Sequence, residues 1–326
     1  MSGVQVPPPL QTAPSRRDFT GGFCFAGASE LGLRNNENLV GMNKSDWPKL
    51  ICVVCGKKPL TATDSGYHCE SCGAEFPLHK ATGLPVFVSE RSPLDTAEIL
   101  KHQVSESALD LDVANSHWNT GPLRQMLDKT SGKTVLSYGS GDGGDRKWLE
   151  KAGYQLVCFD IYPGPYTDVV CDGHELPFDD AQFDIVVSTA VFEHLYNPFQ
   201  AAREIFRVLK PGGTLVGSAA FLEAYHANSY FHMSHLGLTE VFKRAGFSEI
   251  ELHPGWSFVE SLNGRFWVWN NVKAIGRLTR PWRRFRYLVG MALWKVAYGL
   301  KGRSVPERIR LGFAGSLLFR AVKPGE

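Results

Sequence analysis

The chain has 326 residues, of which 43% are hydrophobic and 21% are charged. This composition excludes disorder over the whole length, and the length allows one core of about 200 residues plus a smaller module. The longest apolar stretch near the C-terminus, residues 287–300, is interrupted by Lys295. It is shorter than the ~20 apolar residues of a membrane-spanning helix, so no such span is expected.

The net charge of +2 is unevenly distributed along the chain. Residues 265–310 contain 12 Lys and Arg and one acid, Glu307, so this segment carries +11 and the remainder −9. The pattern predicts one basic patch and argues against a uniformly basic surface for nucleic acids.

The first 45 residues are rich in Pro, Gly, Ser and Asn and show no sustained period, which predicts a disordered tail. Residues 15–19 resemble a twin-arginine export motif, but the apolar run after them is short and ends at Glu30 without a small-residue cleavage site. Export is therefore the less favoured prediction, and the cytoplasm is the expected compartment. Met42 is an alternative start of translation.

Four of the seven cysteines form two C-x2-C pairs, Cys52 with Cys55 and Cys69 with Cys72, separated by 13 residues. An odd number of cysteines with such pairs favours metal binding in a reducing compartment over a disulfide framework. A glycine follows each pair, so each pair can occupy a tight turn that points two thiolates at one ion. Four soft ligands suit tetrahedral Zn²⁺, which predicts a structural zinc site, with four reduced cysteines as the alternative. His68 is expected to be a strand residue and not a fifth ligand.

Residues 50–88, which contain both pairs, resemble the small zinc-ribbon modules that precede the catalytic domain in several bacterial methyltransferases. The resemblance implies a zinc ribbon over residues 46–90 and a partner domain after it, but no activity of the ribbon itself. A helical linker and cap is expected over residues 91–130.

From residue 133 onward, short β-rich runs alternate with helical patterns, which predicts an α/β fold with a parallel sheet flanked by helices. One helix has clear start signals, because Asn197 can cap it and Pro198 occupies its first position. The expected strands are 134–138, 155–159, 168–171, 183–188, 214–219, 249–252 and 311–322, and the expected helices are 145–152, 198–209 and 238–245.

A glycine turn follows the first of these strands, where Gly139, Gly141 and Gly144 satisfy the G-x-G-x-x-G pattern. Such a turn lets a nucleotide approach the backbone closely, and Asp160 at the end of the second strand can accept hydrogen bonds from both ribose hydroxyls. These features alone fit a nicotinamide dinucleotide as well as S-adenosylmethionine.

Four linked motifs discriminate between the two cofactors. They are DGHELPFD at 172–179, FDIVVS at 183–188, VFEHL at 191–195 and EIFRVLKPGG at 204–213. In this order they resemble the class I S-adenosylmethionine-dependent methyltransferases. The resemblance implies a Rossmann-like seven-stranded sheet with S-adenosylmethionine as the cofactor. One family feature is absent, because Ser137 stands where the first strand commonly carries an acid.

The resemblance also implies which residues hold the cofactor. The glycines of the turn would line its methionine and ribose, and Asp160 would bind the ribose. The Asp172 carboxylate, with the two backbone groups after it, would hold the adenine. The full set is Tyr138, Gly139, Gly141, Asp160, Ile161, Asp172, Gly173 and His174.

Methyl transfer requires acceptor and donor to be aligned, with a general base only where the acceptor is a hydroxyl. The segment after the fifth strand lies where related enzymes have an acceptor loop. His226 and His232 in this segment, together with His194, are the candidate catalytic residues, although each of them could equally cap or pack. A second metal site at Glu193 and His194 is not expected, because Ala190 stands where metal-using relatives need a further Glu.

Residues 257–310 separate the expected sixth and seventh strands, and a connection this long inside a compact domain usually has a structure and purpose of its own. The segment contains four Trp, and Lys or Arg flank residues 287–300 on both sides. This arrangement predicts a helical insertion that lies on an anionic membrane surface or forms a lid. RNA phosphates are a less favoured partner, and a hairpin packed on the core is the alternative without a partner.

The sequence therefore predicts a methyltransferase domain over residues 131–256 and 311–326 that follows a zinc ribbon and methylates a small molecule, sugar or glycolipid. An RNA methyltransferase is the second hypothesis. A catalytically silent cofactor-binding module and a nicotinamide oxidoreductase are the remaining ones. The sequence does not specify the oligomeric state.

Overall fold

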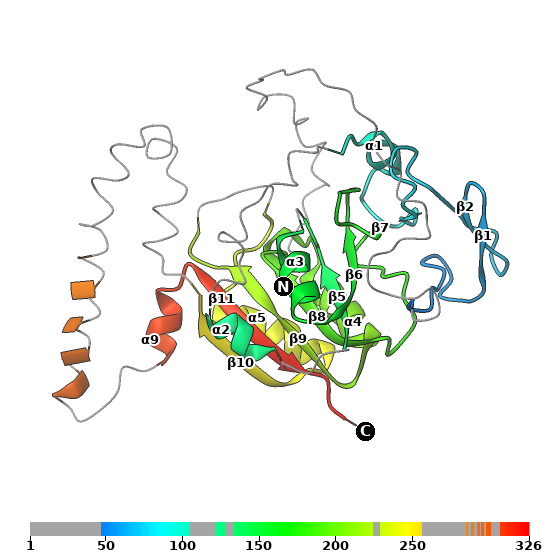
Figure 1. Cartoon of the computed structure of the whole chain (residues 1–326). Coiled ribbons are helices and arrows are strands. Elements are labelled where there is room, and N and C mark those ends of the chain that lie inside the picture. The colour runs from blue at the N-terminus through cyan, green and yellow to red at the C-terminus, as the bar shows by residue number, and fades with distance from the viewer. Residues whose placement is uncertain are drawn as a thin grey trace, which may run out of the picture. The chain divides into compact units, whose positions relative to one another are not determined.

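The computed structural model describes most of the chain between residues 47 and 325 (Figure 1). The described residues are 47–104, 121–127, 133–141, 143–223, 229–255, 285, 288–289, 292–293, 295–296, 298–300 and 307–325. The predicted tail, part of the predicted linker 91–130 and most of the predicted insertion 257–310 lie outside them.

A small antiparallel sheet carries the second cysteine pair. Its strands are β1 (Leu60–Thr63), β2 (Gly66–Cys69) and β3 (Glu75–Pro77), in the order β1-β2-β3. Because β2 ends at Cys69, this pair occupies the turn between β2 and β3. His68 lies in β2 opposite Thr61, which confirms that it is a strand residue.

A second sheet forms the centre of the fold. Its strands are β4 (Val86–Phe87), β5 (Thr134–Tyr138), β6 (Gln155–Asp160), β7 (Val169–Cys171), β8 (Phe183–Thr189), β9 (Leu209–Ala220), β10 (Ser248–Pro254) and β11 (Ser316–Val322). The order is β10-β11-β9-β8-β5-β6-β7-β4, in which β11 is antiparallel to both of its neighbours and the other pairs are parallel.

This sheet has eight strands where seven were expected. The additional strand is β4, which pairs Val86 with Val170 and Phe87 with Cys171 at the edge of β7. A strand of two residues is too short to show a period of two in the sequence, so the pattern that identified the other strands could not find it.

The helices among the described residues are short to medium in length. They are α1 (Thr96–Lys101), α2 (Gly121–Met126), α3 (Gly144–Lys151), the 3₁₀ helix η6 (Phe192–His194), α4 (Pro198–Val208), α5 (His235–Ala245) and α9 (Glu307–Gly312). The predicted start of α4 is confirmed, because the Asn197 side chain accepts from the Gln200 N–H and Pro198 is the first helical residue. Among the described residues, no helix is long and apolar enough to span a membrane.

Both faces of the large sheet are buried, and neighbouring residues of one strand pack into different cores. In β5, Leu136 joins the core that contains α4 and α5, whereas Val135 joins the core that contains α2 and α3. In β6, Val157 and Cys158 divide in the same way. Because side chains alternate along a strand, a parallel sheet covered on both faces is apolar at nearly every position.

The last predicted strand begins later than expected. Residues 311–315 were assigned to it, but Leu311 belongs to α9 and the strand starts at Ser316. Leu311 is nevertheless buried in the core, because a short helix brings it there. Its hydrophobicity therefore gave no information on which kind of element it belongs to.

Candidate functional site

The turn between β5 and α3 leaves one of its glycines open to a ligand. Gly139, Gly141 and Gly143 all have positive φ angles, +72°, +49° and +77°, which favour glycine. A Cβ on Gly139 would clash with Val191, and one on Gly143 with the Tyr166 ring. A Cβ on Gly141 would meet nothing within 4 Å, so a ligand can reach the backbone at this point.

The Asp160 carboxylate lies beside Gly141, at the end of β6. Its Oδ2 accepts the Gly141 N–H at 2.8 Å, and its Oδ1 accepts the Tyr162 N–H at 3.3 Å. A carboxylate has about four acceptor positions, so the backbone donors among the described residues do not use all of them. Burial raises the pKa of this carboxyl, and the backbone N–H groups act in the opposite direction. The next side chain, Ile161, is 38% exposed and offers an apolar surface beside these acceptors.

The Asp172 carboxylate has internal partners on both of its oxygens. Oδ1 accepts from the His174 N–H at 2.9 Å and from His174 Nδ1 at 2.6 Å. Oδ2 accepts from the hydroxyls of Ser92 at 2.5 Å and Tyr196 at 3.3 Å. Burial raises the pKa of Asp172, but the hydrogen bonds from His174 and Ser92 outweigh it and hold the pKa below its usual value. The carboxylate thus shapes the loop after β7, and the predicted contact between this loop and adenine stays a prediction.

Two other predicted cofactor residues support this loop from within the protein. Tyr138 is buried, and its hydroxyl donates to the Gly173 carbonyl at 2.8 Å. The buried His174 ring stacks on Tyr196 with centroids 3.8 Å apart. Its Nε2 accepts the Asn197 N–H at 3.2 Å, so Nδ1 carries the proton that is shared with Asp172. Tyr138 and His174 therefore position the backbone around the site.

The structure brings together the segments of two of the three candidate histidines. His194 ends η6, directly after β8. The Glu193 carbonyl accepts the N–H groups of Tyr230 at 2.6 Å and Phe231 at 3.1 Å, which joins the segment of His232 to η6. The third candidate, His226, lies outside the described residues. The catalytic role of all three histidines stays a prediction.

Sequence reasoning missed three residues near the site. Ser140, inside the glycine turn, has a buried hydroxyl that lacks a hydrogen-bond partner among the described residues. Its position between two glycines of the motif could have drawn attention to it. Ser92 and Tyr196 contact Asp172 from distant parts of the chain, and nothing in the local sequence marks them.

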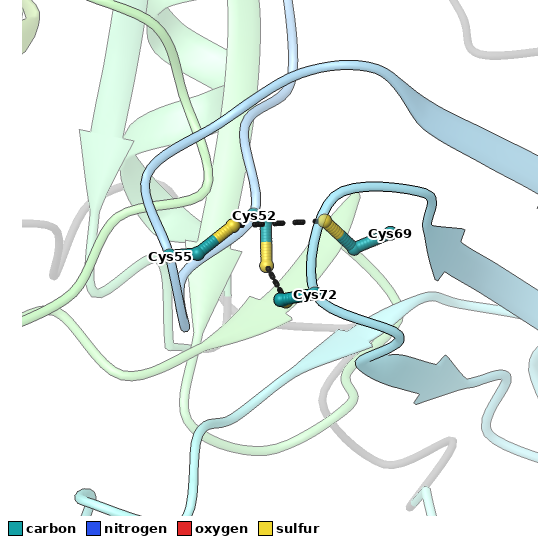
Figure 2. A group of neighbouring side chains, drawn as sticks. All are labelled: Cys52, Cys55, Cys69 and Cys72. Carbon is teal, nitrogen blue, oxygen red and sulfur yellow. Dashed lines mark hydrogen bonds between the residues drawn. The ribbon is translucent and has the colours of Figure 1, made fainter.

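The four predicted zinc ligands converge on one point (Figure 2). All four Sγ atoms lie within 4.8 Å of one another, and the distances Cys52 to Cys72 and Cys55 to Cys69 are both 3.7 Å. These distances exceed the ~2.05 Å of a disulfide bond. A tetrahedral Zn²⁺ with Zn–S bonds of ~2.3 Å has edges of about 3.8 Å between its sulfur atoms.

The turns that carry these cysteines are also those expected of a metal site. Each pair is followed by a glycine with positive φ, +71° at Gly56 and +75° at Gly73. The N–H of Gly56 donates to Cys52 O at 2.7 Å and that of Gly73 to Cys69 O at 2.8 Å, which closes each turn. The donor set and the geometry therefore fit structural zinc. Among the residues that the structure describes, no other group of three or more potential ligands converges in this way.

Comparison with known proteins identifies the central part of the chain. Residues 136–217 match a family model described as a methyltransferase domain. This segment runs from β5 into β9 and contains the glycine turn, Asp160 and the Asp172 loop. Residues 136–217 form a methyltransferase domain. The prediction of a methyltransferase domain in this part of the chain is confirmed, whereas its predicted bounds, 131–256 and 311–326, stay a prediction.

Curated relatives are similar to part of the chain. A "probable S-adenosylmethionine-dependent methyltransferase" of Mycolicibacterium smegmatis is 29% identical over 146 residues, which is 39% of this chain and 56% of the relative. An uncharacterized methyltransferase of Mycobacterium sp. strain KMS is 33% identical over 95 residues, 26% of this chain and 38% of the relative. The chain thus spans less than two thirds of either relative.

Solved structures are similar to part of the chain at low identity. Phosphoethanolamine N-methyltransferase 2 of Haemonchus contortus, in complex with S-adenosyl-L-methionine, has a TM-score of 0.43 and 22% identity. The match covers 64% of this chain and 53% of that one. A TM-score this low says nothing about the substrate.

Proposed function

We propose that the protein is an S-adenosylmethionine-dependent methyltransferase that acts on a small molecule, sugar or glycolipid. The observation that carries the proposal is the open backbone at Gly141 beside the Asp160 carboxylate, within a methyltransferase domain. These groups fit the cofactor, because a ribose presents two neighbouring hydroxyls to one carboxylate.

Several residues would hold the cofactor. When bound, S-adenosylmethionine supplies a methyl group on a sulfonium centre. Asp160 would accept hydrogen bonds from the ribose hydroxyls, and the exposed side chain of Ile161 would cover one face of the adenine. The backbone of Gly173 and His174 would contact the adenine edge, supported by Tyr138 and Asp172.

The acceptor would lie between η6 and the segment around His232. Tyr230 and Phe231 are 62% and 45% exposed, so this segment offers aromatic surface to an acceptor. For a hydroxyl acceptor, His194, His232 or His226 would take the proton that the acceptor releases. For an amine acceptor, no base is needed beyond water.

The test is incubation of the purified protein with methyl-labelled S-adenosylmethionine and a fractionated cell extract, with Asp160→Ala as the control. Label that depends on Asp160 in the lipid, glycan or small-molecule fraction supports the proposal. Label in RNA would overturn the acceptor class in favour of the RNA hypothesis. Failure of the wild-type protein to bind S-adenosylmethionine would overturn the activity, and protection from thermal unfolding by NAD would favour an oxidoreductase.

A second proposal concerns an anionic membrane surface. Apolar side chains at a spacing typical of one helix face are exposed, and they are Phe285, Leu288, Val289, Leu293, Val296 and Leu300. The sequence around them, residues 265–310, carries a net charge of +11. Apolar surface combined with excess positive charge is what binds to anionic lipid.

Vesicle sedimentation tests this second proposal. The double variant Leu293→Glu/Leu300→Glu is expected to lose association with vesicles of anionic phospholipid, because both residues are largely exposed and their replacement leaves the core intact. Phe313→Glu, at a 48% exposed residue outside this face, is the matched control. Equal association of both variants and the wild type would remove the membrane from the proposed partners.

A further inference from the structure

The segment that follows Cys72 contacts the part of the methyltransferase domain that contains the proposed cofactor site. Its strand β4 extends the large sheet at β7, and the Val170 N–H donates to the Pro85 carbonyl at 2.9 Å. Phe87 of β4 is fully buried and contacts the rings of Tyr67 and Phe76 at centroid distances of 5.2 and 5.1 Å. Because Phe87 pairs with Cys171, the small sheet is anchored one residue before Asp172.

A second connection runs through Arg91. Its guanidinium donates to the Val53 carbonyl, between Cys52 and Cys55, at 2.6 Å and contacts Glu175 at 3.0 Å. The Glu175 N–H in turn donates to the Asp172 carbonyl at 3.0 Å. One side chain therefore joins the first cysteine turn to the loop that follows β7.

A third connection is the hydrogen bond from the Ser92 hydroxyl to Asp172 Oδ2 at 2.5 Å. The same segment continues into α1, where Glu98 accepts the Tyr162 hydroxyl at 3.2 Å and His102 stacks on the Tyr162 ring at 4.6 Å. The Tyr162 N–H is one of the backbone donors to Asp160. Both carboxylates that define the cofactor site are thus reached from the N-terminal segment.

We propose that residues 47–102 support the cofactor site. Metal bound by the four cysteines and the adenosyl group bound by the methyltransferase domain then stabilise each other's binding. The metal fixes the turn that holds Arg91 and the sheet that holds β4. Arg91, Ser92 and β4 in turn fix the loop around Asp172. The proposal rests on the proposed function, because it names a positioning role for Ser92 and Arg91 at that same cofactor site.

Reciprocal coupling follows from this arrangement. If the metal increases the affinity for the cofactor by a given factor, the cofactor must increase the affinity for the metal by the same factor. A coupling of about tenfold is expected, within the roughly 5- to 150-fold range typical of such linked sites. The factor by which the metal increases cofactor affinity must therefore equal the factor by which the cofactor increases metal affinity.

The experiment uses the full zinc-loaded chain and S-adenosylhomocysteine as the probe. Calorimetry compares its affinity for the wild type, for Ser92→Ala and for Ser65→Ala, a matched control at an exposed turn of the same small sheet. Ser92→Ala is expected to keep its zinc and bind the probe about tenfold more weakly, whereas Ser65→Ala binds like the wild type. Equilibrium competition with a chelator then measures zinc affinity with and without the probe.

The outcomes separate this inference from the proposed function. If the wild type fails to bind S-adenosylhomocysteine, the proposed function itself is wrong. If the wild type binds it, Asp160→Ala does not, and Ser92→Ala binds as tightly as the wild type, the coupling is wrong while the proposed function stands. An affinity for zinc that is the same with and without S-adenosylhomocysteine would also overturn the coupling.

Discussion

Replacement of Arg146 by Met should destabilise the protein more than any change to a surface ion pair. Arg146 lies in the first turn of α3, and its Nη1 donates to Asp168 at 2.9 and 3.0 Å and to the Tyr166 carbonyl at 3.0 Å. Both side chains of the Arg146–Asp168 pair are only 4% exposed. The pair holds the helix that follows the glycine turn against the loop before β7.

The expected cost is about 3–5 kcal/mol, because the variant leaves the Asp168 charge buried without its partner. This is a large fraction of a typical unfolding free energy of about 5–15 kcal/mol. The same substitution at Arg244, whose ion pair with Glu240 is 67% and 50% exposed, should cost no more than about 1 kcal/mol.

A double variant separates two contributions to the loss of stability, the unpaired buried charge of Asp168 and the lost packing of Arg146. Both Arg146→Met and Arg146→Met/Asp168→Leu leave the Tyr166 carbonyl and Glu150 without the Arg146 guanidinium. Relative to Arg146→Met, the double variant removes the unpaired Asp168 charge and leaves the Cys158 N–H without its acceptor at 2.8 Å, a cost of about 1–3 kcal/mol. The double variant should therefore be more stable than Arg146→Met alone. Lower pH should also reduce the loss of stability in Arg146→Met. Burial raises the pKa of Asp168 and Arg146 lowers it, so without Arg146 the carboxylate takes up a proton more readily and its unpaired charge disappears.

Urea unfolding followed by circular dichroism measures these differences at pH 7 and at pH 5. The reasoning is refuted if Arg146→Met costs less than about 1 kcal/mol, or if the double variant is no more stable than the single one. Either result would mean that the pair is solvated and that α3 is held by its apolar contacts.

Three further predictions concern the two sites. Asp160→Ala should abolish binding of S-adenosylmethionine in calorimetry without changing the zinc content, and unchanged binding would show that the ribose contact is assigned to the wrong residue. Cys72→Ser should lower the zinc content measured by atomic absorption and lower the melting temperature, since Cys72 is one of the four predicted zinc ligands; a full zinc content would argue for another ligand set. Asp172, whose folded pKa is below the unfolded value of about 3.9, should contribute stability above that pH and lose it as the pH falls through the folded value. Acid unfolding of Asp172→Asn should therefore depend less on pH in this range than that of the wild type, and identical curves would contradict the assignment.

Local patterns in the sequence predicted most of the elements and the cluster of four cysteines. The glycine turn, the Asn197 cap with Pro198, and the two cysteine pairs each depend on residues a few positions apart, so backbone preference and ligand spacing specify them. The strands from β5 to β9 could also be predicted from local sequence, because strands of a parallel sheet that is buried on both faces consist of short runs of apolar residues.

Only the tertiary structure decided how residues 47–102 contact the proposed cofactor site. The pairing of β4 with β7 uses backbone N–H and C=O groups, which do not depend on the side chain, so it leaves no mark in the sequence. The hydrogen bond between Ser92 and Asp172 joins residues 80 positions apart, and it fills an acceptor position that the sequence had assigned to a ligand. Residue types and spacing reveal which groups can bind, but the lone pairs that are still available depend on the neighbours that the folded chain brings to them.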